Sequence, residues 1–98
     1  MNNLAHTVIA PFTVAEARGY YDGCCIEFVG EVMMERIPGG RLAYFLTPGH
    51  ATWRYHAAFE LNGIIHDLWQ DQPMPLEDFM RAIGADEVEY PAEEMESV

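Results

Sequence analysis

The sequence contains no lysine, and its positive charge comes from five arginines set against 16 acidic residues. The formal charge of -11 repels nucleic acid backbones, so we expect no direct binding to nucleic acid. The same charge would suit a basic protein partner, including one that normally holds nucleic acid. Solubility combined with a GC-rich genome, which disfavours lysine codons, is the plainer explanation, and the sequence leaves both open.

Long hydrophobic runs are also missing, because the uninterrupted apolar stretches are only a few residues long. No segment is therefore expected to span a membrane. The first residues, MNNLAHTVIAPF, lack the basic start and the apolar core of a signal peptide. These absences favour a cytoplasmic protein. Delivery into a target cell by an exporter that needs no such signal is the alternative.

Cysteine is scarce, and the two that occur, Cys24 and Cys25, are adjacent. Neighbouring cysteines rarely bridge each other because the geometry is strained, so we expect no structural disulfide framework. The sequence has no Cys-x-x-Cys spacing and its four histidines are scattered, so we expect no metal and no cofactor. Free thiols fit a reducing compartment.

The chain of 98 residues, half of them hydrophobic, predicts one globular domain over 1–98. Its last stretch, 86–98, carries six acidic residues and no basic one, which predicts an exposed acidic tail. The apolar, β-branched residues 4–12 predict a short edge strand or an arm.

Three helices are expected. Thr13 and Glu16 form a capping box at the start of a helix over 14–21, which Asp22-Gly23 ends. A second helix begins near Cys25 and ends at Pro38-Gly39-Gly40. A third covers 76–83. The second helix has one apolar stripe, spaced i, i+3, i+4, i+7 and i+8, and made of Cys25, Phe28, Val29, Val32 and Met33.

Residues 41–47 predict a strand, and residues 50–61 and 64–69 predict two more around Asn62-Gly63. Asn-Gly between β-rich runs is the strongest local signal for a two-residue hairpin, because the turn needs positive φ at both positions. With Leu61 and Ile64 as the closing pair, His56 and Asp67 fall on one face as diagonal neighbours, roughly 7 Å apart at the backbone. A carboxylate in that position can orient the imidazole so that its other nitrogen acts as a base.

Cys25 is the candidate nucleophile. A thiol at a helix N-terminus lies at the positive end of the helix dipole, and free backbone N–H groups there can stabilise an oxyanion. If the Cys25 helix packs on the His56 face, a Cys-His-Asp site results. A buried free cysteine in an apolar stripe is more often a core residue than a nucleophile, so the combination rather than Cys25 alone carries the hypothesis.

The order G-x-C-x-x-F at Gly23–Phe28, followed by H-A-x-F-E-L-N-G-x-I-x-D across 56–67, resembles the minimal papain-fold cysteine hydrolases. These occur among bacterial toxin domains and phage-encoded proteins and are similar in layout to NlpC/P60-type peptidases and transglutaminase-like folds. The resemblance implies an α+β papain-like domain in which a Cys-bearing helix packs on three or four antiparallel strands. It also implies that Cys25 is the nucleophile, His56 the general base and Asp67 the orienting group.

The sequence departs from that pattern in two ways. The doublet leaves Cys24 as a rival nucleophile, although Cys25 lies on the helical stripe. No glutamine precedes the cysteine, so backbone N–H groups would stabilise the oxyanion, with Gln70 or His50 as candidate helpers. Trp69 shares the His56 face and is a candidate wall of a substrate groove.

Two functions from different classes follow. The first is a cysteine hydrolase or acyltransferase acting on an amide or peptide bond of a protein or peptide substrate. The second is a small acidic inhibitor of phage type that occupies a basic, nucleic-acid-binding surface of a host protein, on a scaffold whose site is inactive. Thiol reactivity at Cys25 discriminates the two.

Overall fold

The strands form a five-stranded antiparallel sheet in the order β4-β3-β2-β1-β5, and helices lie on both of its faces. The computed structural model describes residues 2–48 and 54–91. The predicted α+β class is confirmed, but the predicted three or four strands are too few. The elements are α1 (Leu4–Thr7), α2 (Val14–Tyr20), α3 (Cys25–Glu27), η1 (Phe28–Met33), α4 (Met34–Arg36), β1 (Arg41–Leu46), β2 (Tyr55–Leu61), β3 (Ile64–His66), β4 (Met74–Pro75), α5 (Leu76–Ile83) and β5 (Glu87–Glu89).

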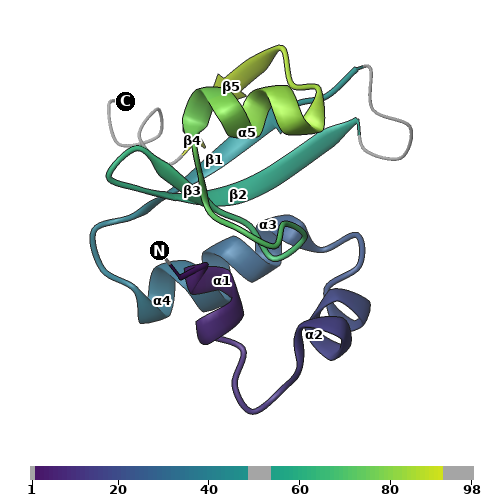
Figure 1. The fold of residues 1–98 in the computed structure, drawn as a ribbon, viewed down its shortest axis with the longest axis vertical. Helices are drawn as coiled ribbons and strands as arrows, with labels where there is room; N and C mark the ends of the chain where they lie inside the picture. The colour runs from purple at the N-terminus through teal and green to yellow at the C-terminus, as the bar shows by residue number, and fades with distance from the viewer. Residues whose placement is uncertain (1, 49–53, 92–98) are drawn as a thin grey trace.

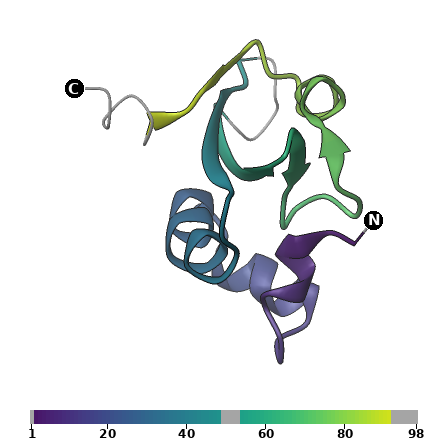
Figure 2. The same ribbon diagram turned by 90° about the vertical axis from the view of Figure 1, so that its left-hand side faces the viewer.

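The sheet separates two hydrophobic clusters. In Figure 1, α5 lies on one side of the strands and α1 to α4 lie on the other, and Figure 2 shows the same layers from the side. One cluster joins the first four helices to β2 through Phe28, Met33 and Phe59. The other joins α5 to β1 and β2 through Phe79 and Phe45. Alternate residues of β2 therefore face different helices.

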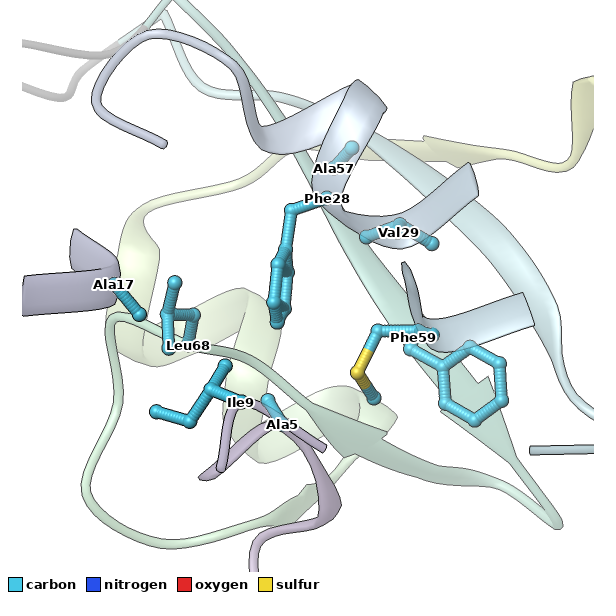
Figure 3. Close-up of a cluster of buried hydrophobic side chains, with 9 residues drawn as sticks. Ala5, Ile9, Ala17, Phe28, Val29, Ala57, Phe59 and Leu68 are labelled. Atoms are coloured by element: carbon cyan, nitrogen blue, oxygen red, sulfur yellow. The ribbon is translucent and has the colours of Figure 1, made fainter. Parts of the chain in front are cut away.

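The helix predicted to begin near Cys25 is confirmed as a continuous helical segment over 25–36, built from α3, η1 and α4. Its middle turn is a π-helix, a feature that apolar periodicity does not reveal. Phe28, Val29 and Met33 are buried on the predicted stripe, and Cys25 packs at the edge of the same cluster. Figure 3 shows Phe28 pointing into this cluster between α2, β2 and the residues that follow β3.

The predicted capping box is present in α2, where the Thr13 side chain accepts from the Glu16 backbone and Glu16 accepts from the Thr13 backbone. The helix over 76–83 is also confirmed as α5. It ends at Gly84, whose φ of 70° is the left-handed conformation that glycine adopts without strain.

The prediction of a strand or arm over 4–12 is wrong. Residues 4–7 form the short helix α1, because the Asn3 side chain accepts a hydrogen bond from the backbone N–H of Ala5 and caps it. An apolar, β-branched composition favours a strand, but a helix cap and tertiary packing can override this preference. Here Ala5 and Ile9 bury against the Phe28 cluster instead.

The hairpin has the predicted register, with Leu61 opposite Ile64 and Phe59 opposite His66. The turn is formed by Asn62 and Gly63, with φ of 53° and 80°. The second strand is shorter than predicted, because β3 ends at His66 and residues 67–70 form a turn instead.

The acidic segment over 86–98 begins as part of the sheet. Glu87–Glu89 is strand β5, which pairs with β1, and residues 92–98 lie outside the described residues. Among residues 2–48 and 54–91, no helix has the length and apolar character needed to cross a membrane.

Candidate active site

The site forms where β3 stops pairing with β2. β3 faces only Phe59, Glu60 and Leu61, so the backbone of β2 ahead of these residues has no β3 partner in the ladder. The backbone N–H of Ala57 donates instead to Sγ of Cys25, at 3.4 Å. Because β3 ends before it reaches Ala57, the Ala57 N–H can donate a hydrogen bond to the sulfur of Cys25.

His56 reaches this edge from the opposite face of the sheet. It stands opposite Phe45, and its ring packs against Phe79 of α5, with centroids 6.2 Å apart. The Cys25 helix therefore does not pack on the face of β2 that carries the His56 side chain. Side chains of consecutive residues alternate across a sheet, so His56 and Ala57, whose N–H donates to Cys25, present their side chains to opposite faces.

His56 and Asp67 form a buried hydrogen-bonded pair, each with 2% of its side chain exposed. His56 Nε2 lies 3.0 Å from Asp67 Oδ1. With Asp67 at Nε2, a thiol that exchanges a proton with this imidazole would do so at Nδ1. The other carboxylate oxygen, Oδ2, is buried and has no hydrogen-bond partner among the described residues.

Opposing effects set the pKa values of the thiol and the imidazole. Burial raises the pKa of Cys25, but hydrogen bonds from His56 and from the Ala57 N–H, with the His56 charge, outweigh it and lower the pKa below its ordinary value. Burial lowers the pKa of His56, but hydrogen bonds to Asp67 and Cys25 and the charges of both groups raise it to about 9. Both shifts favour a thiolate–imidazolium pair at neutral pH.

The backbone geometry distinguishes Cys25 from Cys24. Cys24 is the N-cap residue, and its carbonyl accepts the first helical hydrogen bond from the Phe28 N–H. Cys25 is the first helical residue, so its own N–H belongs to the group that a helix leaves without an intrahelical acceptor. The structure thus places Cys25, rather than Cys24, against the backbone N–H of Ala57, next to His56 in β2, and at the start of the helical segment.

Residues 67–70, which carry Asp67, are held by a residue that the sequence interpretation missed. The buried side chain of Asn3 donates from Nδ2 to the carbonyl oxygens of Asp67 and Gln70, both at 2.9 Å. Arg18 Nε donates to the Leu68 carbonyl at 2.8 Å. A helix-capping asparagine followed by a short apolar run is the only signal that could have indicated this role.

The remaining predicted site residues differ in what the structure says of them. Trp69 packs edge-on against the His56 ring, with centroids 5.7 Å apart, and also against Phe28. Gln70 is half-buried, and its carbonyl accepts from Asn3. His50 lies outside the described residues. Both cysteines are free thiols.

The site presents ionisable side chains and backbone donors. Within 2–48 and 54–91, no three His, Cys, Asp or Glu side chains cluster so that they could hold a metal ion. What the site offers is a polarised thiol, a buried imidazole oriented by a carboxylate, and backbone N–H groups. A comparison with known proteins finds no matching family model, no matching curated protein and no matching solved structure.

Proposed function

We propose that the protein is a papain-like cysteine hydrolase or acyltransferase that acts on an amide or peptide bond. The observation that carries the proposal is the buried pair of His56 and Asp67, 3.0 Å apart, next to the Ala57 N–H that donates to Sγ of Cys25. Burial of an ionisable group destabilises a protein unless the group is paired, and apolar side chains at a purely structural core position would give equal or greater stability.

The order of the elements supports the papain-like assignment. A cysteine begins a helix, and the histidine and the aspartate follow on the two arms of an antiparallel hairpin with a tight turn. This is the layout that the sequence resemblance implied for this family. The pKa of His56, raised to about 9, adds support because an imidazolium beside the thiol stabilises the thiolate.

In the proposed acylation step, the Cys25 thiolate attacks the carbonyl carbon, and a C–S bond forms while the carbonyl oxygen becomes an oxyanion. The free N–H at the start of the helical segment stabilises that charge. The imidazolium of His56 then gives its Nδ1 proton to the leaving nitrogen as the C–N bond breaks. Asp67 holds Nε2 throughout. The products are a thioester on Cys25 and an amine.

In the second step a nucleophile attacks the thioester, and His56, now neutral, takes its proton. Water gives hydrolysis and an amine gives acyl transfer. If the first leaving group is ammonia from a carboxamide, the net reaction is deamidation. In each case the C–S bond breaks and the thiolate–imidazolium pair returns, so the same residues support all three reactions.

Trapping the acyl-enzyme tests this proposal. The protein is mixed with p-nitrophenyl acetate, quenched in acid, and its mass is measured before and after peptide mapping. We expect one acetyl group on Cys25 in the wild type, with a burst of nitrophenol, and none on that peptide in Cys25→Ala. A Cys24→Ala variant that still acetylates at Cys25 excludes the rival thiol. Acetylation at the same rate in His56→Ala would contradict the proposal.

We infer a protein or peptide as substrate and a cytoplasmic site of action, either in the producing cell or in a target cell. The thiolate chemistry requires a reduced Cys25, and both cysteines are free. The charge of -11 argues against nucleic acid as the substrate.

The charge also favours a second candidate, an acidic inhibitor that binds a basic protein surface. Three of the five arginines are already in ion pairs, namely Arg18 with Asp71, Arg41 with Glu60 and Arg81 with Asp78. The unbalanced charge is therefore overwhelmingly negative. This candidate predicts binding to a basic protein that weakens steeply with salt, equally in wild type and Cys25→Ala.

A further inference from the structure

The helices α1 to α4 lie on one face of the sheet. Beyond Cys25, towards β5, the side chains on this face are partly exposed. Residues opposite each other in an antiparallel ladder share a face. Tyr44 stands opposite Ala57 on one side and Glu89 on the other, and Leu46 stands opposite Tyr55 and Glu87. These side chains of β1, β2 and β5 therefore continue the same face from the proposed nucleophile towards β5.

Two tyrosines form the centre of this surface. The rings of Tyr44 and Tyr55 are stacked, with centroids 5.6 Å apart and an interplanar angle of 5°. Tyr55 is 54% exposed, so one ring of the stack is open to solvent. The pKa of Tyr44 is raised by partial burial and by the charges of Tyr55, Cys25 and Glu89. Tyr44 is thus within electrostatic reach of both the thiol and the acidic strand.

The outer rim of the surface is acidic. Glu87 and Glu89 are exposed on β5, and both point to the tyrosine face because Val88 between them packs with the α5 cluster. A cleft of about 420 Å³ opens at this end, lined by Leu46, Pro48, Arg54, Tyr55, Asp86 and Glu87. The carboxylates of Asp86 and Glu87 and the guanidinium of Arg54 line the cleft. Glu89 stands opposite Tyr44 on the same face of the sheet.

We propose that this surface, made of Tyr44, Leu46, Tyr55, Glu87 and Glu89, binds the part of the substrate next to the reacting carbonyl, and that this part is a basic peptide segment. A guanidinium or ammonium group can lie over an open tyrosine ring while its charge faces the two carboxylates. The inference rests on the proposed function, since it assigns the substrate class of the same site.

A second copy of this chain does not suit the surface. The chain has a charge of -11 and no lysine, so the acidic rims of two copies would repel each other. An anionic segment would meet the same repulsion, and a neutral apolar segment would leave both carboxylates without a partner. Charge complementarity therefore selects a cationic occupant.

The test uses two irreversible probes that differ only in one side chain, the chloromethyl ketones of Ala-Ala-Arg and Ala-Ala-norleucine. The Cys25 sulfur displaces chloride from either probe, so the second-order rate constants report binding beside the nucleophile. All proteins carry Cys24→Ala, so that one thiol of the pair reacts. We expect the arginine probe to react about tenfold faster at low ionic strength, and the preference to shrink towards unity at about 1 M salt.

Two variants with matched controls locate the effect. Glu87→Gln/Glu89→Gln should lower the preference for arginine about fivefold. Glu35→Gln/Glu77→Gln changes the net charge equally, at exposed positions on α4 and α5, and should leave the preference unchanged. Tyr55→Leu should lower it about threefold, whereas Tyr20→Leu, which removes another exposed ring, should not.

Equal rates for the two probes, or the same loss in the Glu35/Glu77 control, would overturn the inference. A fall in both rates with rising protein concentration would show that a second copy covers the surface and would also overturn it. Iodoacetamide, a neutral probe, separates this failure from failure of the proposed function. If Cys25 reacts fast with iodoacetamide but shows no preference for the arginine probe, the basic substrate class is refuted and the proposed enzyme function stands. If Cys25 reacts no faster than an ordinary thiol but the arginine probe still reacts faster than the norleucine probe at pH 9, the enzyme function is refuted and the binding surface stands.

Discussion

Nε2 of His56 lies 3.0 Å from Oδ1 of Asp67, although the two residues stand on different arms of a hairpin and Asp67 has already left the ladder. The turn at Asn62-Gly63 sets which residues face each other, and the end of β3 frees Asp67 to approach. In the proposed reaction the other ring nitrogen, Nδ1, exchanges the proton with the thiol of Cys25 at the start of the helical segment. The hairpin and the end of its second strand thus account for the contact between His56 and Asp67.

Replacing Asp67 by asparagine (Asp67→Asn) should weaken the imidazolium. The amide oxygen of the new side chain can still accept a hydrogen bond at Nε2, but the substitution removes the negative charge that helps to raise the pKa of His56 to about 9. We expect the pKa of His56 to fall towards its ordinary value of about 6.5 and alkylation of Cys25 at pH 7 to slow about tenfold. NMR titration of the imidazole and iodoacetamide kinetics measure the two effects. An unchanged imidazole pKa would contradict the assignment of Asp67.

Asn3→Ala should affect both stability and the site. It removes the cap of α1 and two donors to residues 67–70, so the free energy of unfolding should fall by about 1–3 kcal/mol. The midpoint for Cys25 alkylation should rise, since Asp67 is less well held against His56. Thr13→Ala removes the cap of α2 and should lose about 1 kcal/mol without moving that midpoint. If both variants leave the midpoint unchanged, Asn3 has only a structural role.

The pH dependence of amide cleavage should be bell-shaped. Activity needs a Cys25 thiolate, which forms as pH rises through its lowered pKa, and an imidazolium, which is lost as pH rises through about 9. Alkylation needs only the thiolate and should reach a plateau instead. Rate profiles for a peptide substrate and for iodoacetamide from pH 4 to 11 make the comparison. A cleavage rate that stays constant above pH 10 would exclude His56 as the acid.

Gly63→Ala should destabilise the hairpin. Gly63 has a φ of 80°, where a Cβ is strained, so we expect a loss of about 1–2 kcal/mol. Gly19→Ala is the matched control, because Gly19 lies within α2 with open space around it and alanine is the better helix former. That control should gain up to about 1 kcal/mol. Urea unfolding of both variants gives the values, and equal effects would contradict the turn assignment.

The sequence predicted those parts of the fold that depend on local patterns. The capping box at Thr13, the stripe beginning at Cys25 and the Asn62-Gly63 turn each specify structure within about ten residues. The hairpin register in turn predicted that His56 and Asp67 would meet. Their roles in a reaction stay predictions.

Features that depend on distant contacts were missed. The strand β4 has only two residues, and two of the three residues of β5 are glutamates, so neither has a composition typical of a strand. Each forms because it pairs with a neighbouring strand, β4 with β3 and β5 with β1, at an edge of the sheet. Residues 4–7 became helical through the Asn3 cap and burial of Ala5. The Cys25 helix packs on the face opposite the His56 side chain, and its sulfur accepts from the Ala57 N–H where β3 has ended. The alternation of side chains within β2 does not predict where β3 ends.

The most direct test of the central claim is the rate of iodoacetamide alkylation at Cys25 against pH, read by tandem mass spectrometry to separate it from Cys24. It is measured on wild type and His56→Ala. The thiolate–imidazolium pair predicts fast labelling of Cys25 with a midpoint below the ordinary free-thiol value, lost in the variant. Labelling with a midpoint near the free-thiol value of about 8.5, unchanged in His56→Ala, would contradict it.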